Sequence, residues 1–231
     1  MYLLLDIGNT REKAALFSAG NISPLPQLTA DSLMTLPLIA VYFACVANDA
    51  RLNDLKLKLG LDSIPWRKVS SEAQAFGVTN CYSEPHLLGV DRWLALLGSQ
   101  QLFSEQSVMV VDAGTALTVD WLDERGFHQG GWIMPGLRLQ QQSVVEQTAK
   151  VFNKELLEAR LIPGRETISC LQNGCLAAIT GAIRQGWLLR KAQHLVLTGG
   201  DALYLKPQLA DLPVTTVPLL IFHGLARYID H

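Results

Sequence analysis

Short apolar runs alternate with amphipathic segments along most of this chain. Four apolar runs have the length and composition of buried strands, at residues 2–5, 38–46, 108–111 and 195–197. Other segments repeat apolar residues at helical spacing, and we expect helices at about 48–59, 90–103, 138–149, 173–191 and 219–230. Because strands alternate with helices throughout, the pattern predicts an α/β protein. We expect turns over residues 18–26, and a glycine-rich link, either a hinge or a substrate-facing loop, over Gly130–Gly136.

Two strand-turn-strand units stand about half a chain apart. The first apolar run leads into Asp6-Ile7-Gly8-Asn9-Thr10-Arg11-Glu12-Lys13, and the third leads into Asp112-Ala113-Gly114-Thr115. A repeat separated by about half of 231 residues predicts a duplicated domain with a boundary near residue 106, giving lobes over 1–106 and 107–231. Coincidence between two unrelated units is the alternative, and the shared order of Asp, Gly and Thr makes it less attractive.

The first of these turns has the groups that a nucleoside triphosphate needs. The Asp6 carboxylate can hold Mg²⁺ or its water shell, and backbone N–H groups around Gly8 can approach phosphate oxygens closely. Asn9 and Thr10 can donate to those oxygens, and Lys13 can place a positive charge beside them. A plain β-turn is the alternative. Two such turns, one in each lobe, would grip a phosphate chain from both sides.

A second chemical element opens the helix expected at 90–103. Asp91 and Arg92 follow Gly89 and Val90 in its first turn. An acid is favourable there for the helix dipole, but an arginine is not. In the functional interpretation Asp91 accepts a proton from a substrate hydroxyl and Arg92 binds a carboxylate or phosphate. In the alternative they are a helix-start acid and a solvated arginine.

Three other positions have both a functional and a structural interpretation. The paired glycines of Thr198–Ala202 would let an adenine ring lie against the backbone, or they form a tight turn. Tyr82 either closes over a small ligand or is a partly buried surface tyrosine. Thr167 either caps a turn or donates to a ligand.

Composition limits the class of protein. Hydrophobic residues make up 49% and charged residues 17%, so a substantial core is available. A net charge of −2 argues against broad nucleic-acid binding. Cys45, Cys81, Cys170 and Cys175 form no Cys-x-x-Cys pair, and we expect reduced thiols in a cytoplasmic protein. No basic leader and no apolar run long enough to cross a bilayer is seen, so we expect neither a signal peptide nor membrane insertion.

Taken in order, these motifs resemble type III pantothenate kinase, a family of the acetate-kinase, sugar-kinase, Hsp70 and actin superfamily. The resemblance rests on the elements beginning at Asp6, Gly89, Asp112, Gly130 and Thr198, and it covers most of the chain. The Gly-Val-Asp-Arg element separates this family from the rest of the superfamily. The resemblance implies two ribonuclease-H-like lobes with a nucleotide cleft between them. It also implies ATP-dependent phosphorylation of pantothenate, the first step of coenzyme A synthesis.

The resemblance also implies roles for individual residues. Asp91 would be the general base, and Asp112 would bind a monovalent cation, K⁺ or NH₄⁺. The ATP contacts would be Asp6, Ile7, Gly8, Asn9, Thr10, Arg11, Glu12, Lys13 and Thr115. The pantothenate contacts would be Tyr82, Gly89, Val90, Asp91, Arg92 and Thr167. The family uses Mg²⁺ with ATP and is dimeric, with the substrate site near the subunit interface.

Other functions compatible with these motifs are a different kinase, or a polyphosphate-type phosphatase on the same fold. A non-enzymatic ATP-binding accessory protein is a third possibility, against which the Asp91-Arg92 pair argues. Actin-like polymerisation is disfavoured by the short chain. The chain has neither a Gly-x-x-x-x-Gly-Lys-Ser/Thr loop nor a Gly-x-Ser-x-Gly elbow, which argues against P-loop enzymes and serine hydrolases.

Overall fold

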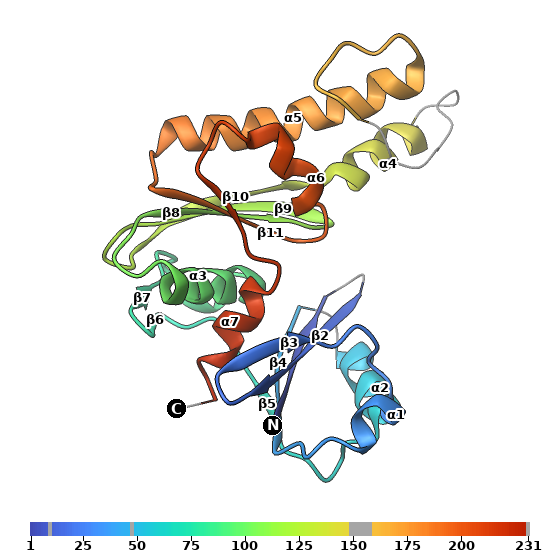
Figure 1. Ribbon diagram of the computed structural model, residues 1–231, viewed down its shortest axis with the longest axis vertical. Helices are drawn as coiled ribbons and strands as arrows, with labels where there is room; N and C mark the ends of the chain where they lie inside the picture. The colour runs from blue at the N-terminus through green and yellow to red at the C-terminus, as the bar shows by residue number, and fades with distance from the viewer. Residues whose placement is uncertain (9–10, 47–48, 148–158, 230–231) are drawn as a thin grey trace. The chain divides into compact units, whose positions relative to one another are not determined.

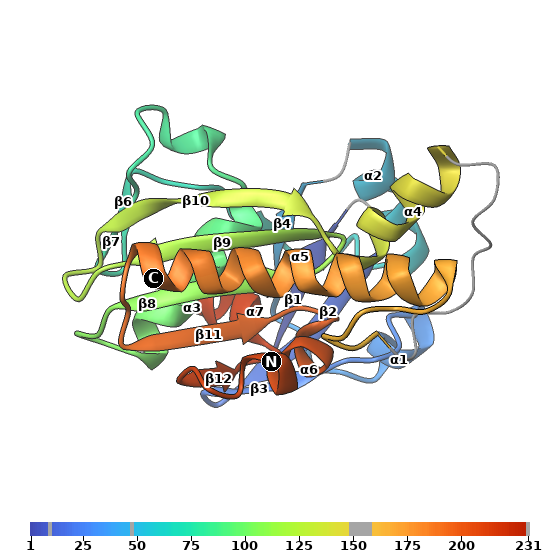
Figure 2. The same cartoon turned by 90° about the horizontal axis from the view of Figure 1, so that it is seen from above.

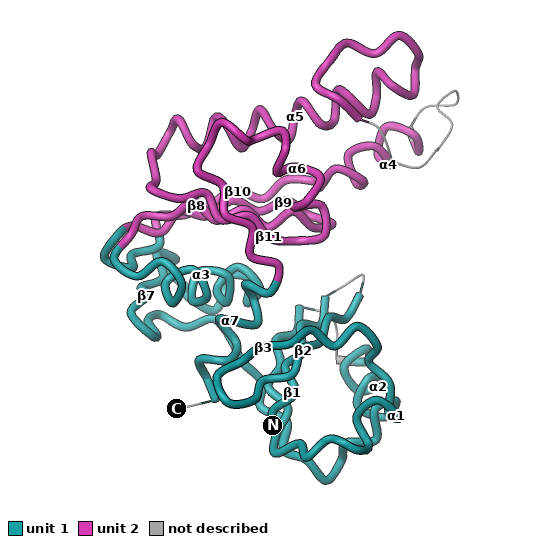
Figure 3. The backbone as a smooth tube through the Cα atoms, viewed as in Figure 1, with its two compact units in different colours: residues 1–105, 124–128, 219–231 teal, residues 106–123, 129–218 magenta. Residues whose placement is uncertain are grey.

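The computed structural model describes residues 1–8, 11–46, 49–147 and 159–229, which form two compact units (Figure 3). The first unit comprises residues 1–105, 124–128 and 219–231, and the second comprises residues 106–123 and 129–218. Each unit contains one five-stranded sheet (Figure 1).

The sheet of the first unit has the order β3-β2-β1-β4-β5. Its strands are β1 (Tyr2–Ile7), β2 (Glu12–Ser18), β3 (Asn21–Pro24), β4 (Ala40–Cys45) and β5 (Trp66–Lys68). The helices are α1 (Ala30–Met34), α2 (Asp49–Leu59), α3 (Val90–Leu102) and α7 (Leu220–Ala226). A small ribbon, β6 (Gln74–Ala75) with β7 (Val78–Thr79), and a 3₁₀ turn, η1 (Pro85–Leu87), lead into α3. Apolar residues of β1 and β4 pack against Leu52, Leu55 and Leu59 of α2.

The sheet of the second unit has the order β10-β9-β8-β11-β12. Its strands are β8 (Val108–Ala113), β9 (Ala116–Leu122), β10 (His128–Pro135), β11 (His194–Thr198) and β12 (Val214–Thr216). The helices are α4 (Leu137–Gln147), α5 (Thr167–Leu189) and α6 (Ala202–Leu205), followed by the 3₁₀ turn η2 (Lys206–Leu209). Figure 2 shows α5 lying along one face of this sheet, where Leu176, Ile179 and Ile183 join its buried core.

The two sheets are built on the same plan. In each, the first strand pairs antiparallel with the second and parallel with the fourth. Asp6 is aligned with Lys13 across one hairpin, and Asp112 is aligned with Thr118 across the other. The repeated topology confirms the prediction of a duplicated α/β domain and places both aspartates at the same point of the plan.

Two segments differ from the sequence predictions. Gly130–Gly136 was expected to be a link, but most of it belongs to β10, whose Trp132 and Met134 pack against the core. Part of the expected turn region 18–26 is likewise a strand, β3. Both are edge strands of their sheets, and edge strands tolerate glycine and proline because one side of the backbone forms no ladder.

The final helix belongs to the first unit, whereas the sequence-based boundary placed it in the second lobe. The reason is a close backbone contact between α3 and α7. A Cβ added to Gly98 would overlap the Leu220 carbonyl, and one added to Gly224 would overlap the Leu94 carbonyl. Two helices can pack this closely only where glycine occupies the contact positions. The chain therefore returns to its first unit after completing the second.

Among the described residues, no helix combines the length and apolar character needed to cross a membrane.

Candidate active site

The first turn brings a carboxylate and a lysine together at the end of β1. Asp6 is buried, and its Oδ2 atom lies 3.7 Å from Lys13 Nζ on the neighbouring strand. The Gly8 N–H donates to the Arg11 carbonyl over 3.1 Å and closes the turn. Asn9 and Thr10, predicted to contact phosphate, lie outside the described residues.

Glu12 forms an ion pair and Ile7 is buried, neither of which the sequence indicated. Arg51 of α2 donates to Glu12 Oε1 from Nε at 3.0 Å and from Nη2 at 2.8 Å. Burial is the largest single effect and opposes ionisation of Glu12. The hydrogen bond from Arg51, a backbone hydrogen bond and the positive charges of Arg51 and Lys58 together outweigh it and lower the pKa of that carboxyl. Glu12 thus pairs with α2 while Lys13 pairs with Asp6, as expected for alternate positions of a strand. The Ile7 side chain is fully buried, so only its backbone is available to a ligand.

Asp91 lies close enough to Asp6 for their charges to interact. Burial raises the pKa of Asp6 most strongly, Lys13 opposes this rise, and the negative charge of Asp91 adds to it. Asp91 occupies the first turn of α3, and its Oδ1 atom accepts a hydrogen bond from the Arg92 N–H at 2.8 Å. A carboxylate in the first helical turn is stabilised by the helix dipole. The structure therefore brings the predicted phosphate-binding aspartate and the predicted base together within one unit.

Arg92 is buried and points to Tyr82. Its Nη1 atom donates to the Tyr82 hydroxyl over 2.9 Å, and its guanidinium carbon lies 5.8 Å from the centroid of the tyrosine ring. A solvated arginine, the alternative considered above, is excluded. Gly89 is the N-cap residue of α3 and Val90 its first residue, and both are partly buried.

Two residues of this region were missed by sequence analysis. His128 is fully buried and stacks on Tyr82, with ring centroids 6.1 Å apart and an interplanar angle of 14°. Its Nδ1 atom lies 3.4 Å from the Cys81 Sγ atom. Asn80 is also buried, and its side chain fixes the chain around Tyr82. His128 is 46 positions from Tyr82 by their numbers, so no local sequence signal joins them.

In the second unit, the turn after Asp112 is enclosed by neighbouring backbone. The Gly136 N–H donates to the Thr115 carbonyl over 2.9 Å, and the Asp201 N–H donates to the Ala113 carbonyl over 3.0 Å. Gly199, with φ of +93°, lies so close that an added Cβ would overlap Asp112 Oδ1 and the Ala113 carbonyl. Asp112 Oδ1 thus lies against the backbone of Gly199 at a separation that only glycine permits. Thr115 itself is exposed.

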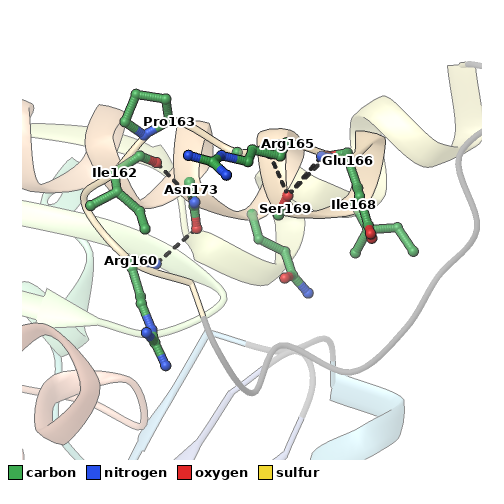
Figure 4. A pocket seen from close by; sticks show the side chains of 10 residues that line it. Arg160, Ile162, Pro163, Arg165, Glu166, Ile168, Ser169 and Asn173 are labelled. Atoms are coloured by element: carbon green, nitrogen blue, oxygen red, sulfur yellow. Dashed lines mark hydrogen bonds between the residues drawn. The ribbon is translucent and has the colours of Figure 1, made fainter.

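Thr167 is the first residue of α5 and is exposed. Its neighbours in the chain, Glu166 and Ile168, line a pocket of about 720 Å³ together with Arg160, Arg165 and other residues (Figure 4). Figure 4 shows the internal bonds of this pocket: Ser169 Oγ accepts from the N–H groups of Arg165 and Glu166, and Asn173 bridges Arg160 and Ile162. Thr167 is therefore positioned at a helix start, in a different unit from Tyr82 and Arg92.

The described residues contain no group of three or more His, Cys, Asp or Glu side chains arranged to hold a metal ion. A Mg²⁺ ion at Asp6 would thus depend on water and phosphate oxygens for its other ligands, as is usual for this ion. The buried carboxylate of Asp6 suits such a site. Asp112 Oδ1 and the Ala113 carbonyl both lie against Gly199, and oxygen ligands of this kind suit a hard cation bound without histidine or thiolate.

Comparison with known proteins assigns the family. A family model described as type III pantothenate kinase matches residues 2–188. The chain belongs to the type III pantothenate kinase family. A type III pantothenate kinase of Colwellia psychrerythraea is 34% identical over 99% of this chain and 100% of its own length. One from Pseudoalteromonas translucida is 36% identical, over 97% of this chain and 94% of its own.

Solved structures show the fold. A Campylobacter jejuni protein described as a conserved transcriptional activator of the Baf family has a TM-score of 0.64 and 22% identity, covering 99% of this chain and 97% of its own. The activator of 2-hydroxyisocaproyl-CoA dehydratase from Clostridium difficile, with bound ADPNP, has a TM-score of 0.56 and 12% identity, covering 98% and 93%. The predicted two-lobed, actin-like ATPase fold is confirmed, as are the family and the assignment to kinases. The roles of individual residues stay predictions.

Proposed function

We propose that this chain transfers the γ-phosphoryl group of ATP to the primary hydroxyl of pantothenate, with Asp91 as the general base. The family supports the reaction, namely ATP-dependent phosphorylation of pantothenate in coenzyme A biosynthesis. The observation that supports the residue assignment is the electrostatic proximity of Asp91 to Asp6. The base and the carboxylate beside the phosphates must lie near each other, because the acceptor hydroxyl at the base becomes bonded to the γ-phosphorus of ATP.

The residues of the first unit divide the work. Arg92, fixed by Tyr82, presents a guanidinium that suits the carboxylate of pantothenate. Asp91 orients the acceptor hydroxyl and takes its proton as that oxygen bonds to the γ-phosphorus and the bond to ADP breaks. Lys13 supplies positive charge to the phosphates, and Arg11, exposed at the same turn, is placed to add to it. Gly8 contributes its close backbone approach, and Glu12, which is bonded to Arg51 of α2, is proposed as a further ATP contact.

Two cations complete the proposal. Mg²⁺ bound near Asp6 would neutralise the charge of the transferring phosphoryl group. A monovalent cation, K⁺ or NH₄⁺, is assigned to Asp112 because its carboxylate lies beside the Ala113 carbonyl, where Gly199 permits the close approach of the backbone. Thr115 is the ATP contact of the second unit, and Thr167 a further pantothenate contact. A homodimer and a cytoplasmic location are carried over from the family resemblance.

A coupled ADP-release assay tests the proposal. Purified chain with ATP and Mg²⁺ is offered pantothenate or a panel of other hydroxyl acceptors, with K⁺ and again with only Na⁺. We expect turnover with pantothenate and K⁺, and little with any other combination. Equal turnover with an unrelated alcohol, or ATP hydrolysis that ignores pantothenate, would assign the chain to another kinase or to a phosphatase.

A further inference from the structure

Asn80 uses both its side-chain amide and its backbone N–H to shape the chain around Tyr82. Its side chain is buried, with Nδ2 donating to the carbonyls of Glu72 and Pro85, both over 3.1 Å. Its Oδ1 atom accepts from the Tyr82 N–H over 3.0 Å, and its own N–H donates to the Ala73 carbonyl over 2.9 Å. Asn80 therefore ties three separate stretches of backbone together. Bonds from an asparagine side chain to the residue two positions on are typical of tight turns.

A second side chain secures the other end of the same loop. Ser71 Oγ donates to the Leu88 carbonyl over 2.7 Å, one residue before the N-cap of α3. Asn80 fixes the loop at Tyr82. Ser71 fixes it at Leu88, directly before the segment that contains Gly89, Asp91 and Arg92. The two bonds involve adjacent residues: Ser71 bonds to Leu88, and the next residue, Glu72, accepts from Asn80. The segment from Ser71 to Ala73 is thus bonded both to Asn80, near Tyr82, and to Leu88, just before α3. It therefore links the position of Tyr82 to that of α3.

The segment from Ser71 to Ala73 is itself held by Tyr228, which follows α7. The Tyr228 hydroxyl donates to Glu72 Oε1 in a short hydrogen bond, and it accepts from Trp93 Nε1 at 3.1 Å. Phe76 packs edge-on against the Tyr228 ring, with centroids 4.9 Å apart. Trp93 is fully buried and directly follows Arg92. The segment is therefore held through the side chain of Glu72 as well as through its backbone carbonyl.

We infer that Asn80 is a positioning residue for acceptor binding, acting through Tyr82 on Arg92. The Arg92 guanidinium keeps its place because the Tyr82 hydroxyl accepts its hydrogen bond, and Tyr82 keeps its place because Asn80 holds its backbone. Asn80 touches no reacting atom in this arrangement. Its loss loosens the arginine that recognises the acceptor, while Asp6 and Lys13, on separate strands, keep their geometry. The inference rests on the proposed function, in which Arg92 binds the acceptor.

Asn80→Ala tests this role through a split between kinetic constants. Loss of three side-chain hydrogen bonds should raise KM for pantothenate at least about tenfold, with KM for ATP changed less than about threefold. A merely structural defect would lower the amount of active enzyme without separating the two constants. If Asn80→Ala fails to fold, Ser71→Ala, which removes one half-buried bond, should show the same split at smaller amplitude.

A double-mutant cycle shows whether Asn80 acts through Tyr82. In a Tyr82→Phe background Asn80→Ala should have a clearly smaller effect on KM for pantothenate, because the bond it supports is already gone. Asn173→Ala is the matched control: Asn173 is equally buried and bridges two loop residues, but it lies in the second unit, so its effect should add to that of Tyr82→Phe.

The outcomes separate this role from the proposed function. Wild-type chain that fails to phosphorylate pantothenate would overturn the proposed function, and this role with it. Active wild type with an unaltered KM for pantothenate in Asn80→Ala, or full additivity with Tyr82→Phe, would overturn the positioning role alone.

Discussion

Lys13 Nζ lies 3.7 Å from Asp6 Oδ2, yet the pKa of Asp6 is raised. Burial of the carboxylate outweighs the attraction of the lysine, and the charge of Asp91 adds to the rise. A carboxylate whose charge is disfavoured in the folded protein gains from binding a cation. In the proposed function this turn holds Mg²⁺ and phosphate, and the burial of the Asp6 charge is a cost to the protein without these ligands.

The raised pKa has a definite consequence for stability. Folded chain binds the Asp6 proton more tightly than unfolded chain, so the contribution of Asp6 to stability falls as pH rises from the ordinary carboxyl value through the raised pKa. Above the ordinary carboxyl value, Asp6 therefore makes the folded chain less stable than a carboxyl with an unshifted pKa would. We expect Asp6→Asn to raise the thermal unfolding temperature at pH 7.5 without ligands, while turnover falls at least about 10²-fold through lost charge stabilisation.

Asp211→Asn is the control of opposite sign. Asp211 accepts hydrogen bonds from Arg184, and they lower the pKa of its carboxyl to about 2. We expect this replacement to leave turnover unchanged and not to raise the unfolding temperature. A lower unfolding temperature for Asp6→Asn would mean that the ion pair with Lys13 contributes more than the burial of its charge costs.

Asp91→Asn should separate chemistry from nucleotide binding. The amide keeps the shape and still accepts from the Arg92 N–H, but it cannot take a proton. We expect kcat to fall at least about 10²-fold, within the usual range for a lost general base, with ATP affinity nearly unchanged. Steady-state kinetics and calorimetric titration with a non-hydrolysable ATP analogue measure the two quantities.

Asp31→Asn provides the matched control, because Asp31 is likewise an acid in the first turn of a helix, α1. Its loss should alter stability slightly and kcat not at all. Near-normal kcat in Asp91→Asn would refute the assignment of the base.

Arg92→Lys should impair acceptor binding although the charge is retained. Lysine lacks the planar fork of arginine and cannot both donate to Tyr82 and bind a carboxylate bidentately. We expect KM for pantothenate to rise at least about tenfold, with a smaller change in KM for ATP. Arg67→Lys is the control, since Arg67 also stacks on a tyrosine, Tyr42, at 5.6 Å from its centroid but lies on β5. Equal kinetic effects in both variants would exclude a specific role for Arg92.

The sequence predicted the local elements of the site better than their connections. The apolar runs before Asp6 and Asp112 define buried strands, and each turn follows from the residues that form it. The return of α7 to the first unit could not be foreseen, because it depends on two glycines, Gly98 and Gly224, that are far apart in the chain. His128 was missed because its partner, Tyr82, is likewise far from it in the chain. Trp132 and Met134 alternate inward along β10, but the glycines and proline around them masked the strand pattern.

The cation site proposed at Asp112 gives a prediction about monovalent cations. Asp112→Asn removes the charge that would hold K⁺ or NH₄⁺, and we expect turnover that no longer responds to either ion. Gly199→Ala should have the same effect by another route, since its Cβ would overlap both Asp112 Oδ1 and the Ala113 carbonyl and displace these two oxygens. The measurement is kcat as a function of K⁺ at constant ionic strength, with Na⁺ as the replacement.

Gly130→Ala separates displacement of Asp112 from backbone strain. Gly130 has φ of +94°, nearly the same as the +93° of Gly199, but an added Cβ there meets nothing within 4 Å. Both variants carry the strain of a left-handed alanine, of order 1–3 kcal/mol, and both should unfold at lower temperature. Only Gly199→Ala should lose its response to K⁺. If the two variants retain the same response, or if Asp112→Asn keeps full activation by K⁺, the cation does not bind at Asp112.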